Sequence, residues 1–121
     1  MRFKVHRPGL QTHIQDQPRD GFAHYGISPS GPADIIAYHY GNYLVHNKIN
    51  TASLEIALFG PKIEFLDAGY IAITGSKFLI KINDTDLLYN RPIKIEKGQL
   101  LDIGSAIEGA RCYLSIAGGI D

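Results

Sequence analysis

The sequence has little of what marks several special classes of protein. Among its 121 residues there is a single cysteine, so no disulfide can form within the chain, and no Cys/His spacing suits a zinc finger. Twelve basic and twelve acidic side chains give a net charge of zero, which argues against nucleic acid as the main partner. No apolar run approaches the length that crosses a bilayer, and no signal-peptide pattern is present. We therefore expect a cytoplasmic protein that binds neither nucleic acid nor membrane.

Hydrophobic residues make up 45% of the chain and charged residues 20%, which is the ordinary composition of a globular protein. A chain of this length can bury roughly two thirds of its unfolded surface, and it needs no disulfide or structural metal for stability. Residues 1–121 are therefore expected to form one domain with one core.

Most of the chain has the pattern of short strands. Runs of alternating or apolar residues bounded by turn signals predict strands at 3–5, 12–15, 53–59, 62–66, 70–74, 77–82, 92–95, 99–103 and 110–116. Gly75 and Glu108-Gly109 are interpreted as turns between consecutive strands. Turn signals at such regular intervals predict a mainly β fold, closed or nearly closed into a barrel.

One segment, residues 32–46, has a helical period. Its apolar positions, predicted to face the core, are Ala33, Ile36, Ala37, Tyr40 and Leu44. Its polar face is expected to carry Asp34, His39, Asn42 and His46. Asn47 is predicted to close the helix, because asparagine tolerates the left-handed conformation common at helix ends.

The stretch HYGISPSGPAD, residues 24–34, precedes and enters this helix. It lacks the spacing of a nucleophile elbow, and proline replaces the lysine that a phosphate-binding P-loop requires. We expect Ser30 or Gly31 to cap the helix, Pro32 to lie in the first turn, and Asp34 to lie near the positive end of the helix dipole.

Two interpretations of this stretch remain open. The free amides of the helix N-terminus, together with Arg19, His24, Ser28 and Ser30, could hold a carboxylate or phosphate. Alternatively, the glycines and prolines only shape a tight crossing and Asp34 only satisfies the helix end, which is the commoner role of such residues.

Expectations also follow for a glutamate, the cysteine and two histidines. Glu55 lies in an otherwise apolar strand; it is expected to point to water, and if it points inward it needs a partner such as Arg19 or a ligand. In the strand predicted at 110–116, one face carries Ala110, Cys112, Leu114 and Ile116, and the other carries Arg111, Tyr113 and Ser115. Cys112 is therefore predicted to be an inert core residue. His39 and His46 are seven residues apart, too far for one metal ion, and no metal site is predicted.

The order of motifs along the chain resembles a known family. They are Gly9-Leu-Gln-Thr12, Ile14-Gln-Asp16 with Arg19, Gly21-Phe-Ala-His24, Gly26-Ile-Ser28-Pro-Ser30-Gly31 with Asp34, Leu44-Val45-x-Asn47, Leu54-Glu55, Gly60-Pro61, Thr74-Gly75, Tyr113-Leu and Ala117-Gly-Gly-Ile-Asp121. In this order they resemble the C subunit of 5-oxoprolinase, also called KipA, an allophanate hydrolase subunit 2-like family related to the carboxyltransferase region of urea carboxylase. Pro32-Ala33 departs from the family's usual alanine and methionine.

The resemblance implies a cyclophilin-like β-barrel and a place in an ATP-dependent hydrolase that opens 5-oxoproline to glutamate, together with the A subunit and the KipI-like B subunit of that enzyme. Family members continue into a second barrel domain, so this chain is expected to correspond to their N-terminal part and to need partners for activity. The implied roles fall on the substrate-binding residues Arg19, Ser28, Ser30, Gly31 and Glu55, and on the catalytic residues His24 and Asp34.

Two other functions fit the same resemblance. The chain could belong to a biotin-dependent urea carboxylase-like enzyme, although it has no biotin-accepting AMKM motif of its own. It could also be a non-catalytic, KipA-like binding protein or a relic.

Overall fold

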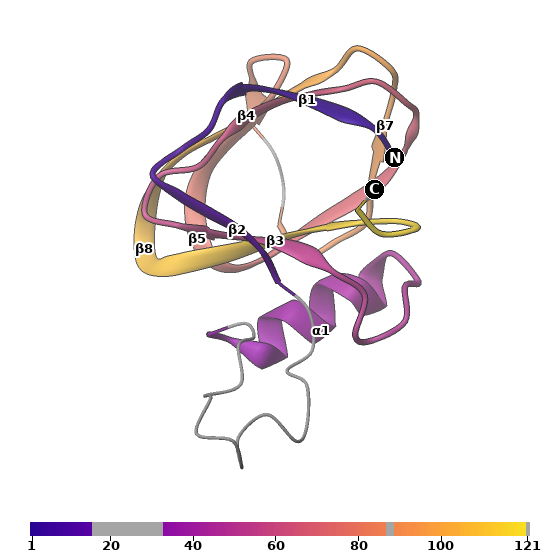
Figure 1. Cartoon of the computed structure of the whole chain (residues 1–121). Helices are drawn as coiled ribbons and strands as arrows, with labels where there is room; N and C mark the ends of the chain where they lie inside the picture. The colour runs from indigo at the N-terminus through magenta and orange to yellow at the C-terminus, as the bar shows by residue number, and fades with distance from the viewer. Residues whose placement is uncertain (16–32, 87–88, 121) are drawn as a thin grey trace, which may run out of the picture.

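A computed structural model describes residues 1–15, 33–86 and 89–120; within this part the side chains of Gln11 and Gln15 are not described. The elements are β1 (Phe3–Arg7), β2 (Gln11–Gln15), α1 (Ile35–Leu44), β3 (Ser53–Ala57), β4 (Lys62–Phe65), β5 (Gly69–Ile82), β6 (Thr85–Asp86), β7 (Ile93–Ile95) and β8 (Leu100–Ile116). The strands curl into a half-barrel, and α1 lies against its outer surface (Figure 1). The predicted mainly β, barrel-like fold with one principal helix is therefore confirmed.

All strand pairs are antiparallel, and one path through the sheet runs β1-β4-β8-β3-β2. The strand β5 pairs with β8 from Ile71 opposite Ile116 to Ile82 opposite Leu101. It also pairs with β6 and β7 at its two ends. Because β8 pairs with β3, β4 and β5, it forms the centre from which the sheet curls.

Two expected turns lie inside strands, so their prediction was wrong. Gly75 is within β5, and Glu108-Gly109 is within β8. The pairing register of these strands shifts just after Gly75, and both glycines have positive φ angles, +99° and +69°. Glycine here permits a bulge that bends a long strand without ending it. Four predicted strands are therefore two long, bent ones.

The apolar core lies inside the curled sheet. Alternate residues of β3, β5 and β8 point into it, among them Ile56, Ile73 and Leu114, each with no exposed surface. Cys112 lies in the same cluster and is fully buried, as predicted. Burial raises the pKa of its thiol to about 12, which keeps the sulfur protonated and unreactive near neutral pH.

The helix is shorter than predicted at both ends. It begins after Asp34, whose side chain accepts a hydrogen bond of 3.1 Å from the Ala37 N–H, so Asp34 is the N-cap. The expectation that Ser30 or Gly31 caps the helix was therefore wrong. At the other end Val45 is the C-cap, and His46, not Asn47, has the left-handed φ of +60°.

The helix also packs with a different face from the one predicted. Ile36 is 79% exposed, whereas Asn42, expected on the polar face, is fully buried. The amide of Asn42 donates to the carbonyl of Thr51 at 2.8 Å, so its burial leaves this donor satisfied. Gly41 faces the sheet, and a Cβ there would lie only 2.3 Å from the Ser115 hydroxyl. This close approach, rather than apolar periodicity, sets the orientation of α1.

In the part of the chain that the structure describes, no helix is long and apolar enough to cross a membrane.

Candidate functional site

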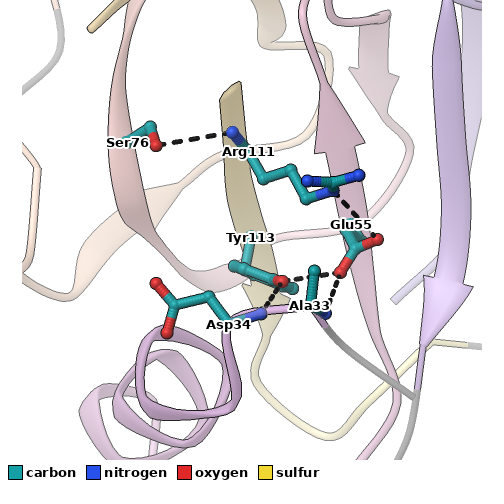
Figure 2. Close-up of polar contacts among 6 residues, drawn as sticks. All are labelled: Ala33, Asp34, Glu55, Ser76, Arg111 and Tyr113. Atoms are coloured by element: carbon teal, nitrogen blue, oxygen red, sulfur yellow. Dashed lines mark hydrogen bonds and ion pairs between the residues drawn. The ribbon is translucent and has the colours of Figure 1, made fainter. Parts of the chain in front are cut away.

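The N-terminal end of α1 lies over the outer surface of the half-barrel, where β3 and β8 are neighbours (Figures 1 and 2). At this point Glu55 of β3 and Tyr113 of β8 are directly opposite each other in the pairing register. Leu54 and Ile56 point into the barrel, so the alternation of the strand directs Glu55 outward, towards the helix. The two side chains thus meet the residues that lead into α1.

Four polar groups form a connected network there (Figure 2). The Tyr113 hydroxyl donates to Glu55 Oε2 at 2.6 Å, and the Ala33 N–H donates to the same oxygen at 2.8 Å. The Asp34 N–H donates to the Tyr113 hydroxyl oxygen at 2.8 Å. Two successive backbone amides before the helix are therefore bound to side chains of two different strands.

Glu55 is 7% exposed, so the expectation that it points to water was wrong. Ala33 and Tyr113 both contact the Glu55 carboxylate, and every residue of β3 is buried. The guanidinium of Arg111 lies beside the carboxylate, with its Nε 3.7 Å from Glu55 Oε1. Beneath the start of α1 the buried carboxylate has the partners it requires, and among the described residues these are Tyr113, Ala33 and Arg111.

The Tyr113 side chain is fully buried, and burial is the largest cause that raises its pKa above the ordinary value of 10.0. The hydrogen bond to Glu55 raises this pKa further, whereas the bond from the Asp34 amide lowers it. The phenol therefore stays neutral near neutral pH. It can then donate to Glu55 and accept from Asp34 at the same time.

Asp34 combines a fixed backbone with an accessible side chain. Its amide is bound to Tyr113, and its Oδ1 accepts from the Ala37 N–H. The residue as a whole is exposed, and it lies at the helix end whose dipole favours negative charge. A carboxylate in this position is held in a defined orientation while remaining open to a ligand or partner.

The other predicted site residues, Arg19, His24, Ser28, Ser30 and Gly31, lie outside the described residues. The described residues on either side of residues 16–32 both contact β3. The backbone of Gln15 pairs with Ser53, and Ala33 binds Glu55 two positions further along the strand.

No group of three metal-ligating side chains occurs among residues 1–15, 33–86 and 89–120.

Tyr113 and Arg111 are functional candidates that sequence reasoning missed. Both were placed on the strand face opposite Cys112, which is correct, but neither was given a role. A signal was available: Glu55 and Tyr113 are polar residues within apolar strands, and a buried carboxylate needs a donor. Only the pairing of β3 with β8 shows that they are partners.

Comparison with known proteins gives the same relatives at the levels of sequence and structure. A family model described as carboxyltransferase domain, subdomain A and B, matches residues 25–121. The chain is 40% identical to urea amidolyase of Lachancea kluyveri over 98% of its own length and 7% of that protein. It is 36% identical to the C subunit of 5-oxoprolinase from Escherichia coli (strain K12) over 98% of its length and 38% of that protein.

A crystal structure of Kluyveromyces lactis urea carboxylase superposes with a TM-score of 0.95 at 40% identity, covering 98% of this chain and 11% of that one. The chain therefore spans well under half of each of these relatives. The family model matches residues 25–121, and the sequence and structure matches cover 98% of the chain, so the chain belongs to the carboxyltransferase domain family, subdomain A and B.

Proposed function

We propose that the chain is a component, similar to the C subunit, of an ATP-dependent 5-oxoprolinase that opens 5-oxoproline to glutamate. The observation that carries the proposal is the placement of Asp34, whose carboxylate is exposed at the start of α1 while its amide is bound to the buried Tyr113. This arrangement occurs in a chain 36% identical to the C subunit of E. coli 5-oxoprolinase. The chain would hold a small amide or carboxylate substrate at this end of the helix.

The proposed roles follow from the charge of the groups. Arg19 and the amide end of α1 would hold the substrate carboxylate, because both favour an anion. Asp34 would accept the lactam N–H or transfer a proton, and His24 would act as its acid or base partner. The hydroxyls of Ser28 and Ser30 and the backbone of Gly31 would orient the substrate.

Glu55 is also proposed to support substrate binding, but through its contacts rather than directly. One of its oxygens, Oε2, accepts from both Tyr113 and Ala33, and the other faces Arg111. These contacts fix the backbone that leads into Asp34. We therefore propose that Glu55 supports the binding site by holding the backbone beside it, without contacting the substrate.

The sequence carries no P-loop that would bind ATP, because proline follows Gly31 where that motif has a lysine. We propose that ATP binds to partner subunits, namely the A subunit and the KipI-like B subunit. The chain spans 38% of its E. coli relative, so we also propose that a further segment or a partner supplies the facing wall of the site.

The proposal is tested by steady-state kinetics of the full assembly with 5-oxoproline and ATP. We expect Asp34→Ala and His24→Ala each to lower turnover by about a hundredfold, the usual contribution of a positioned acid or base. Asp86→Ala and His6→Ala are matched controls, since these residues lie on β6 and β1, away from the start of α1. Unchanged turnover in the Asp34 and His24 variants would remove both residues from the mechanism.

A second candidate function is carboxyl transfer from carboxybiotin to urea or a similar amide. It is favoured by the 40% identity to L. kluyveri urea amidolyase, which exceeds the 36% identity to the E. coli 5-oxoprolinase component. Biotin would arrive on another polypeptide, because the sequence has no AMKM motif. Incorporation of labelled bicarbonate into urea, with no release of glutamate from 5-oxoproline, would favour this function over the first.

A further inference from the structure

We propose that Tyr113 is a positioning residue for Asp34: its hydroxyl holds the Asp34 backbone at the start of α1 and so sets the orientation of the Asp34 carboxylate. This inference rests on the proposed role of Asp34 in the reaction. Tyr113 itself does not contact the reacting atoms, because its side chain is fully buried beneath the residues it binds.

The connectivity of the network supports a positioning role. Asp34 is held at three points: its amide by Tyr113, its Oδ1 by the Ala37 N–H and its carbonyl by the Tyr38 N–H. The contacts with Ala37 and Tyr38 lie within the helix, so they join Asp34 to the sheet only through the helix. The hydrogen bond to the Tyr113 hydroxyl does join Asp34 to the half-barrel, and this hydroxyl comes from β8, the central strand.

The hydroxyl is itself held in one orientation. It gives its single proton to Glu55 Oε2 at 2.6 Å, so its oxygen lone pair is directed to the Asp34 N–H. Glu55 is oriented in turn by the Ala33 amide and by Arg111. The Tyr113 ring also packs against the ring of Tyr38 in α1, with 6.4 Å between the two ring centroids, and this contact limits the rotation of the Tyr113 ring. The groups that hold Asp34 to the sheet are thus each constrained by a neighbour.

Rigid support of this kind affects reaction more than binding. A shift of about 1 Å in a reacting group can lower the rate a hundredfold. We therefore expect Tyr113→Phe, which removes only the hydroxyl, to lower kcat about tenfold and to leave KM within about twofold. The phenyl ring preserves the packing, so the variant is expected to fold.

Tyr89→Phe is the matched control. The Tyr89 hydroxyl also accepts a backbone N–H, from Phe78 at 3.0 Å, but it lies away from α1. We expect this variant to keep wild-type kcat and KM.

Glu55→Gln retains a side-chain oxygen for Tyr113 and Ala33, and it is expected to retain more activity than Glu55→Ala.

The deciding measurement is a double-mutant cycle in the full assembly, using Asp34→Asn and Tyr113→Phe. If Tyr113 acts through Asp34, its substitution causes little further loss of kcat in the Asp34→Asn background. Equal losses in both backgrounds would overturn the inference, since they would indicate a general structural effect. Hydrogen exchange of the Asp34 amide provides an independent readout: it should accelerate in Tyr113→Phe and not in Tyr89→Phe.

The outcomes separate the two proposals. Full activity of Tyr113→Phe beside an impaired Asp34→Asn would overturn only the positioning role. Full activity of Asp34→Asn would overturn the role of Asp34 in the reaction, and the positioning role with it. An unchanged exchange rate of the Asp34 amide in Tyr113→Phe would also overturn the positioning role, whatever the turnover.

Discussion

Cys112 and Tyr113 are neighbours on β8, yet their side chains enter two differently built regions. Cys112 points into the interior of the curled sheet, where it joins aliphatic and aromatic residues such as Leu114 and Phe65. Tyr113 points to the layer between sheet and helix, where it meets Glu55 and the backbone of Asp34. Both residues have no exposed surface.

Burial has a different effect in each of these two regions. In the interior, apolar surface is removed from water without directional bonds, which contributes most to stability. In the layer under α1, the buried Thr74 hydroxyl donates to the Ala37 carbonyl at 2.7 Å, and the partly buried Asn47 amide donates to the Ile116 carbonyl at 2.7 Å. Such bonds add less net free energy but fix the position of the helix.

The largest effect on stability is expected from truncating the interior. Leu114→Ala should lower the free energy of unfolding by about 3 kcal/mol, because it loses buried apolar surface and leaves a cavity. Leu79→Ala is the matched control, since Leu79 is 58% exposed, and it should cost less than about 0.5 kcal/mol. Urea denaturation of the two variants measures this. Equal losses would contradict the assignment of the core.

A smaller loss is expected in the layer under the helix. Glu55→Ala removes the acceptor of the Tyr113 hydroxyl and the Ala33 amide, and it should cost about 2 kcal/mol. Glu64→Ala is the control: this glutamate lies on β4, partly exposed, paired with His6 at 2.8 Å, and should cost under about 1 kcal/mol. Denaturation curves compare the two. A loss for Glu55→Ala no greater than for Glu64→Ala would show that the network adds no stability.

The smallest effect appears only in alkali. The pKa of Cys112 is raised to about 12 and that of Tyr113 is raised above 10.0, so the folded state holds both protons more tightly than the unfolded state. The stability that these two groups contribute is therefore fully present below their ordinary pKa values, 9.0 for Cys112 and 10.0 for Tyr113, and it is lost as the pH rises above those values.

The free energy of unfolding should fall by on the order of 1 kcal/mol between neutral pH and about pH 10. Cys112→Ala should remove the part that begins near pH 9.0, and Tyr113→Phe the part that begins near pH 10.0. Unfolding free energies measured from about pH 7 to about pH 11 check the prediction. Curves of both variants parallel to that of the wild type would contradict it.

Local patterns predicted the type of nearly every element. The alternation of Cys112, Leu114 and Ile116 against Tyr113 and Ser115 placed the interior face of β8 correctly. The turn signals at Gly75 and Gly109 were misleading, because a glycine in a strand can mark either a turn or a bulge. Only the partner strand distinguishes these cases, since a bulge is a property of the pairing.

The candidate site was partly predictable. The position of Asp34 near the helix start follows from local chemistry, although the sequence pattern predicted Ser30 or Gly31, and not Asp34, as the N-cap. The burial of Glu55 could have been inferred from its otherwise apolar strand, because a strand covered on both faces has a near-continuous apolar sequence. Its partners could not, since they come from β8 and from the start of α1.

Local sequence patterns were enough to predict the element types, the interior face of β8, the inert cysteine and the family to which the chain belongs. The fold in three dimensions was needed to show which face of α1 meets the sheet, and that Glu55 and Tyr113 together bind the residues leading into it. The physical reason is that Glu55 and Tyr113 are 58 residues apart, so their contact depends on strand register. Alternation and helical period describe only neighbours along the chain.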